Sequence, residues 1–118
     1  KNIKILPFQK NPYPFIKKSQ LFILSSKYEG LPNSLLEAIV LNIPVISSDC
    51  PSGPSEILDK GKGGLLFTVG DYKSLANKIE YFIKSKNQMI KKKKYAHKRL
   101  NRFDYKLRLH DYYKAICS

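Results

Sequence analysis

The sequence predicts an α/β fold: a Rossmann-like, three-layer arrangement with a parallel sheet between helices, followed by a helical C-terminal tail. Short apolar segments that suit strands alternate with segments of helical periodicity, and this alternation favours a parallel sheet covered on both faces. The run Leu21–Leu24, Leu-Phe-Ile-Leu, is continuous, as in a strand buried on both faces. With 118 residues and 42% hydrophobic content, the chain is large enough for one small domain with a core.

The first half of the chain is expected to form three strands and two helices. Ile3–Leu6 alternates weakly between apolar and polar residues and predicts a short strand. Tyr13–Lys18 predicts a short helix, since Pro14 is tolerated in a first helical turn. After the strand Leu21–Leu24, the segment Asn33–Leu41 is apolar nearly all round and predicts a buried helix. Pro44–Ser47, Pro-Val-Ile-Ser, is the next expected strand.

The second half is expected to be mainly helical. Glu56–Leu58 predicts a short helical turn and Leu65–Thr68 a last strand. Asp71 is a suitable N-cap for a helix at Tyr72–Lys84. The apolar stripe of this helix consists of Tyr72, Leu75, Ala76, Ile79, Phe82 and Ile83. Two further helices, each with apolar residues along one side, are expected at Asn87–Phe103 and Asp104–Ile116.

The chain is strongly basic, with a net charge of +13. Such a charge suits nucleic acid, an anionic membrane face or phosphorylated ligands. A plainer interpretation is a compositional bias, because 19 lysines stand against 3 arginines, and the run Lys91–Lys94 inside a predicted helix then forms a solvated face. A nucleic-acid-binding module is not favoured, because the sequence has neither a helix-turn-helix pattern nor interleaved aromatic and basic residues on a strand.

Several features favour a cytoplasmic protein. No run of about 18 apolar residues suggests a membrane-spanning helix, and residues 1–10 lack the apolar core of a signal peptide. Cys50 and Cys117 have neither metal-site spacing nor a disulfide framework, and they are typical of thiols in a reducing compartment.

Two acids, Glu29 and Glu37, lie eight positions apart in the centre of the sequence. Glu37 falls on a helix that is otherwise apolar, where a carboxylate could bind two adjacent sugar hydroxyls; Glu is almost never fully buried without a partner. Alternatively, Glu37 could complete a capping box with Ser34 at the start of the helix. Glu29 follows an apolar strand in a loop, a position where a Glu is most often solvated surface.

The turn between the two acids suits an anion. Gly30 permits close backbone approach, and Pro32 fits the first helical turn, where its missing N–H costs nothing. The N–H groups of Leu31, Asn33 and Ser34 are then available to a phosphate, because a helix N-terminus attracts negative charge. In open α/β sheets, ligands bind at this edge, where strands end and helices begin.

The segment EGLPNSLLE, followed by A-x(5)-P-V-I-S-S-D-C-P-S-G-P-x-E-I-L, resembles the donor-binding domain of GT-B fold glycosyltransferases of the retaining family four. Upstream, FQKNPYPFIKKSQLFILSS resembles the segment that precedes the motif in that family, and GKGGLLFTVGDYKSLA resembles the segment that follows. The resemblance covers roughly residues 3–84. It implies that residues 1–84 are part of a nucleotide-sugar-binding donor domain and that residues 85–118 are C-terminal helices of the same domain.

The resemblance also implies roles for the matching residues. Glu29 would act as the catalytic residue beside the transferred sugar, and Glu37 would hold the ribose hydroxyls of the nucleotide. The backbone of Gly30, Leu31, Pro32, Asn33 and Ser34 would bind the diphosphate and sugar. The helix dipole would replace a metal ion, so neither a metal nor another cofactor is expected, and the nucleotide sugar, UDP-linked, is the donor substrate.

The implied reaction transfers a hexosyl or N-acetylhexosaminyl group, with retention, to a lipid-linked or surface glycan such as bacterial lipopolysaccharide or capsule, at the inner face of the membrane. Family members also carry an N-terminal acceptor domain, and a Gly-Arg segment and a Lys that neutralise the diphosphate; none lies in these 118 residues. The chain is therefore expected to be incomplete and inactive alone. An inactive truncated remnant that binds nucleotide at most, and an epimerase of the same fold, are the alternatives.

Overall fold

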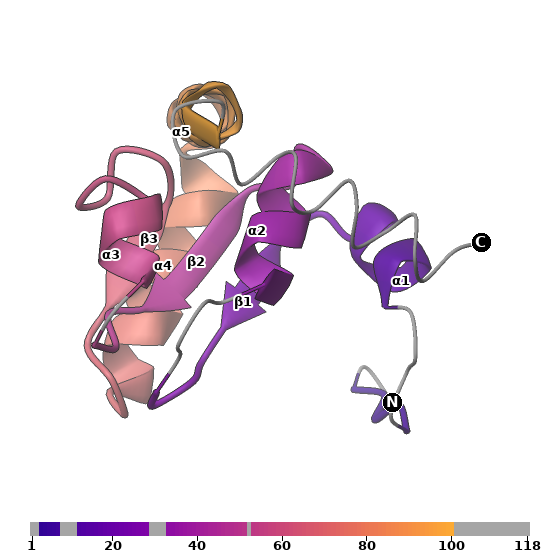
Figure 1. Ribbon diagram of the computed structural model, residues 1–118. Coiled ribbons are helices and arrows are strands. Elements are labelled where there is room, and N and C mark those ends of the chain that lie inside the picture. Colours follow the sequence, from indigo (N-terminus) through magenta and orange to yellow (C-terminus); the bar gives the residue numbers. More distant parts are fainter. Residues whose placement is uncertain (1–2, 8–11, 29–32, 52, 101–118) are drawn as a thin grey trace.

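A computed structural model describes residues 3–7, 12–28, 33–51 and 53–100 of the chain. Its centre is a sheet of three strands, β1 (Phe22–Leu24), β2 (Val45–Ser48) and β3 (Leu65–Phe67), in the order β1-β2-β3 (Figure 1). All strand pairs are parallel, and Ile46 in the central strand aligns with Ile23 on one side and Leu65 on the other. The predicted parallel sheet is thus confirmed.

Helices cover both faces of this sheet, which confirms the predicted three layers. One face packs against α1 (Tyr13–Lys17), α2 (Asn33–Val40) and α3 (Pro54–Ile57). The other face packs against α4 (Tyr72–Lys84) through Leu75, Ile79 and Phe82. Asp71 is the N-cap of α4, as the sequence predicts, and its Oδ1 accepts a hydrogen bond from the Ser74 N–H at 3.0 Å.

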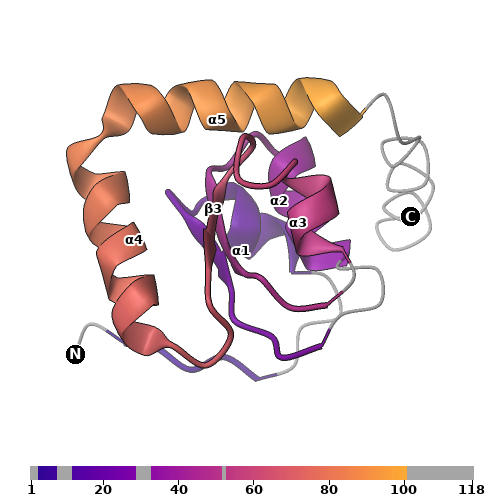
Figure 2. The same ribbon diagram turned by 90° about the vertical axis from the view of Figure 1, so that its left-hand side faces the viewer.

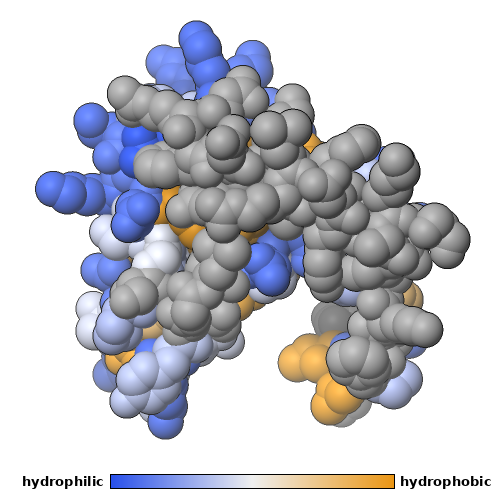
Figure 3. All heavy atoms as spheres, in the orientation of Figure 1, coloured by the Kyte–Doolittle hydropathy of each residue, from blue (hydrophilic) through white to orange (hydrophobic). Residues whose placement is uncertain are grey.

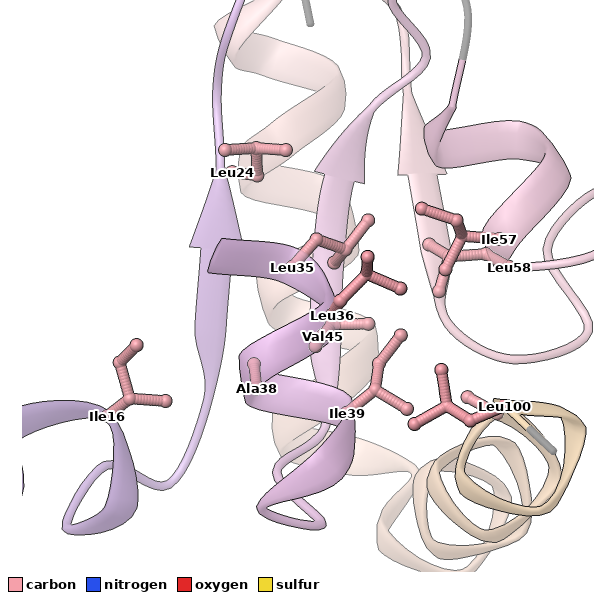
Figure 4. Packing of buried hydrophobic residues seen from close by; sticks show 11 residues of the cluster. Ile16, Leu24, Leu35, Leu36, Ala38, Ile39, Val45, Ile57, Leu58 and Leu100 are labelled. Atoms are coloured by element: carbon pink, nitrogen blue, oxygen red, sulfur yellow. The ribbon is translucent and has the colours of Figure 1, made fainter. Parts of the chain in front are cut away.

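The larger core forms where α2 faces the sheet. Leu35, Leu36 and Ile39 of α2 converge with Val45 of β2 and with residues of the α3 segment (Figure 4). All residues from 35 to 39 are buried, as expected from the apolar character of this helix.

Asn42 terminates α2 in the left-handed conformation, with φ 63°. The N–H of Asn42 donates to the carbonyl of Ile39, and the N–H of Ile43 donates to that of Ala38, each at 3.0 Å. These bonds form a Schellman motif, which satisfies carbonyl groups that the helix leaves open. The chain can then turn directly into β2.

The last described helix, α5 (Lys86–Arg99), crosses the amino ends of the strands (Figure 2). It contributes to both cores: Met89 lies in the cluster on the α4 side, whereas Ala96 and the following Leu100 lie in the cluster on the α2 side. The helix therefore closes the sheet at the end opposite to the loops that follow the strands.

Three expectations are corrected. Ile3–Leu6 is not a strand: Ile3 and Ile5 are 86% and 92% exposed, and none of the described strands pairs with the segment. The strand Leu21–Leu24 is not buried on both faces, because Ile23, on the outermost described strand, is 37% exposed. In the predicted stripe of α4, Tyr72, Ala76 and Ile83 are exposed. Phe103 and the helix expected at 104–116 lie outside the described residues.

Candidate functional site

The candidate site lies at the carboxyl ends of the three strands, and two hydrogen bonds hold these ends together. The Ser48 hydroxyl, at the end of β2, donates to the carbonyl of Ser26 in the loop after β1 at 2.6 Å. On the other side, the N–H of Asp49 donates to the carbonyl of Phe67 at the end of β3 at 2.8 Å. Because parallel strands end at one edge of a sheet, the loops that follow them form one continuous surface.

The amino-terminal end of α2 belongs to this edge, because the helix runs back from it to the start of β2. Asn33, exposed, and Ser34, half-buried, form the first turn, where free N–H groups concentrate positive potential. Both residues lie at the start of this helix as expected, and their role in binding the diphosphate and sugar remains a prediction. Glu29, Gly30, Leu31 and Pro32 lie outside the described residues, so their assignment remains a prediction.

Glu37 is buried, with only 3% of its surface exposed. It lies one turn further along α2, among apolar neighbours on the same helix. The capping-box alternative is not supported: α2 already begins at Asn33, so Ser34 is inside the helix and Glu37 is its fifth residue, not its third. A carboxylate in a low-dielectric position forms strong hydrogen bonds, and the expected contact of Glu37 with the ribose hydroxyls remains a prediction.

A cavity of about 470 Å³ also opens at this edge, beside β3 and α4. Its polar lining residues are Asp49, Thr68, Ser74 and Lys78, and its apolar ones are Leu66, Phe67 and Val69. Sequence reasoning missed it, because these residues come from three separate segments that meet only in the folded chain. The available signal was the position of Asp49 shortly after the predicted strand Pro44–Ser47 and of Thr68 at the end of the predicted strand Leu65–Thr68.

The described residues contain no group of three or more His, Cys, Asp or Glu side chains that could hold a metal ion. Cys50 is buried and free, whereas Cys117 lies outside the described part of the chain. Within that same part, none of the helices has the length and apolar character to cross a membrane.

Comparison with known proteins places the chain in a family. The sequence profile described as "Glycosyl transferases group 1" matches residues 1–99. An uncharacterized glycosyltransferase of Methanocaldococcus jannaschii is 56% identical over 57 residues, which are 48% of this chain and 14% of that protein. The lipopolysaccharide 1,6-galactosyltransferase of Escherichia coli is 38% identical over 68 residues, which are 58% of this chain and 19% of that protein.

A solved structure has the same fold. It is a variant of S. aureus TarM in complex with fondaparinux, alpha-GlcNAc-glycerol and UDP, and it matches 91% of this chain and 22% of its own with a TM-score of 0.71 and 22% identity. The chain thus spans less than a quarter of the length of each of these proteins. Because the family profile covers most of the sequence, the chain belongs to the glycosyl transferases group 1 family.

Proposed function

We propose that the protein transfers a hexosyl or N-acetylhexosaminyl group from a UDP-linked sugar to a lipid-linked or surface glycan, with retention of the anomeric configuration. The observation that carries the proposal is the buried carboxylate of Glu37, one turn inside the helix whose N-terminus meets the carboxyl edge of the sheet. A galactosyltransferase that is named for lipopolysaccharide and a TarM variant crystallised with UDP support the choice of acceptor and donor.

In this proposal the first turn of α2 and Glu37, one turn further along, contribute differently. Glu37 accepts hydrogen bonds from the two ribose hydroxyls, which anchors the nucleotide. The N–H groups at Asn33 and Ser34, with those predicted at Gly30 and Leu31, face the diphosphate. As the bond between the anomeric carbon and the diphosphate breaks, negative charge grows on the leaving oxygen, and a preorganised positive site stabilises it. The same positive site makes a metal ion unnecessary.

The acceptor hydroxyl then attacks the anomeric carbon on the face that the diphosphate leaves. Its proton passes to an oxygen of the departing diphosphate, so that charge and atoms balance. Glu29 lies beside the sugar in this scheme and stabilises positive charge that develops on the ring. The reaction takes place in the cytoplasm, at the inner face of a membrane that the protein contacts peripherally.

Titration calorimetry with UDP tests the anchoring role of Glu37 in the complete protein. Glu37→Gln should weaken UDP binding by about 1–3 kcal/mol, since hydrogen bonds to a charged group contribute that much. Glu80→Gln, which changes an exposed acid on α4, is the matched control and should leave the affinity unchanged. Equal affinities for the wild type and Glu37→Gln, at an unchanged melting temperature, would contradict the proposal.

Full activity of the complete protein in excess EDTA is the expected result for a metal-independent reaction.

A further inference from the structure

The densest charge of the described chain lies on α5. From Lys86 to Leu100 there are seven lysine and arginine residues and no acid. Figure 3 shows hydrophilic side chains projecting from the end of the molecule where Figure 1 places this helix. The question is which of these charges the fold itself uses.

The inner side of α5 is fixed to the turn between α3 and β3. The Lys92 ammonium donates to the Gly61 carbonyl at 2.5 Å, and the Tyr95 hydroxyl donates to the carboxylate of Asp59. Arg99 donates to the carbonyl of Glu56 at 3.2 Å and lies 3.7 Å from the same Asp59 carboxylate. These contacts fix this side of the helix to the turn.

Lys92 is therefore part of the structure and not of a solvated face, which corrects the interpretation of Lys91–Lys94. Burial lowers the pKa of Lys92 below its ordinary value, and the nearby charge of Lys78 lowers it further. Most of the lysines of α5 that do not contact the turn are exposed on another side of the helix.

Three lysines point away from these contacts. Lys91, Lys94 and Lys98 are exposed, and their spacing of three and four residues places them along one line of the helix. None of the three forms an ion pair with another described residue. We name this line the lysine ridge. Ile90 beside it is 42% exposed, and Ile83 at the end of α4 is 62% exposed.

The chemistry of the ridge fits a lipid surface better than a nucleic acid. Its charges all come from lysines, which act as flexible point charges, whereas recognition of individual phosphates favours the planar fork of arginine. The one described arginine of the helix, Arg99, is turned inward. An anionic bilayer attracts such a row of lysines within about one Debye length, and it also accepts the exposed isoleucines at its boundary.

We propose that the lysine ridge of α5 is the surface through which the protein docks on an anionic membrane. The inference deepens the peripheral membrane contact of the proposed function by assigning it to named residues. The docking is electrostatic adsorption without insertion, because the apolar side of α5, at Met89 and Ala96, is already buried in the protein.

Co-sedimentation of the 118-residue chain with vesicles tests this assignment. Vesicles of phosphatidylcholine with phosphatidylglycerol should bind the chain at low salt, and pure phosphatidylcholine should not. Replacing Lys91, Lys94 and Lys98 together by Gln should lower the partition coefficient about one hundredfold, at the contribution per lysine that is typical of anionic membranes. Circular dichroism should give the same spectrum and melting temperature for the variant and the wild type.

A variant with Lys4, Lys18 and Lys73 replaced by Gln loses the same charge at exposed positions outside α5 and is the matched control. It should keep most of the vesicle affinity. Equal losses in both variants would show that only net charge matters and would overturn the proposal, as would tighter ridge-dependent binding to a 20-base-pair DNA duplex than to the vesicles. Because no sugar is transferred in this assay, a chain that binds vesicles through the ridge upholds the inference even if the proposed transfer reaction fails.

Discussion

Two acidic residues carry the proposed chemistry, and kinetics should separate their roles in the complete protein. Glu29→Gln should lower kcat more than it raises KM, because the proposed contact lies beside the carbon where charge develops. Glu37→Gln should mainly raise KM for the donor, because it holds a part of the nucleotide that does not react. Steady-state rates with a UDP-sugar at varied concentration provide the measurement. An unchanged kcat with a raised KM for Glu29→Gln would reassign this residue to donor binding.

Lys92 should make the stability of the chain depend on alkaline pH. Its pKa is lower in the folded chain than the ordinary 10.5. Between these two values the unfolded chain binds more protons, so the free energy of unfolding rises with pH across this window. Lys92→Met removes that contribution. The free energy of unfolding of the wild type minus that of the variant should therefore rise as the pH approaches 10.5. Urea unfolding of both proteins at a series of pH values measures the difference, and a difference that does not change with pH would contradict the prediction.

At the scale of elements, the contact between α5 and the turn before β3 depends on Gly63. A Cβ at this position would lie 2.9 Å from the Cβ of Ala96, closer than real side chains approach. Gly63→Ala should therefore destabilise the chain by about 1–3 kcal/mol, the usual cost of overpacking. Adding Ala96→Gly removes this closest contact and leaves the Cα of residue 96 as the nearest atom, at 3.3 Å.

The single change Ala96→Gly should cost about 1 kcal/mol, as Gly does in a helix. The double variant Gly63→Ala/Ala96→Gly should be more stable than the sum of the two single effects predicts, because the second change relieves the contact that the first creates. Denaturant unfolding of all four proteins completes the cycle. Strict additivity would show that the two positions do not touch in solution.

The elements around the motif could be predicted from the sequence, because local patterns determine them. An apolar run predicts β2. A single acid on an otherwise apolar helix predicts that Glu37 of α2 is buried. The strand predicted at Ile3–Leu6 is wrong, because alternation of apolar and polar residues alone does not supply a neighbouring strand. The contacts of α5 were out of reach: Lys92 and Gly61 are 31 residues apart, and Tyr95 and Asp59 are 36 apart. Nothing local decides which lysine of a run turns inward.

At the scale of the whole molecule, the 118-residue chain should bind a nucleotide weakly and transfer no sugar. In the proposed function it supplies one wall of the site, and it corresponds to less than a quarter of the length of the three relatives described above. Positioning of donor and acceptor accounts for about 7–11 kcal/mol of a barrier of this kind, and one wall cannot provide it. A Kd for UDP near 1 mM, about −4 kcal/mol, is expected. Turnover of labelled UDP-sugars above that of a Glu29→Ala/Glu37→Ala control would show that the chain is a sufficient enzyme.

The length of α4 has a consequence for where the reaction can occur. This helix starts beside the carboxyl edge of the sheet, where the N–H of Asp71 donates to the carbonyl of Thr68, and it ends at α5. Thirteen helical residues span about 20 Å. A bilayer held against the lysine ridge, with α4 along its normal, would therefore keep the bond-forming step about that far from the headgroups. Acceptors whose terminal sugar stands well clear of the lipid should react, whereas a single sugar attached directly to a membrane lipid should be out of reach.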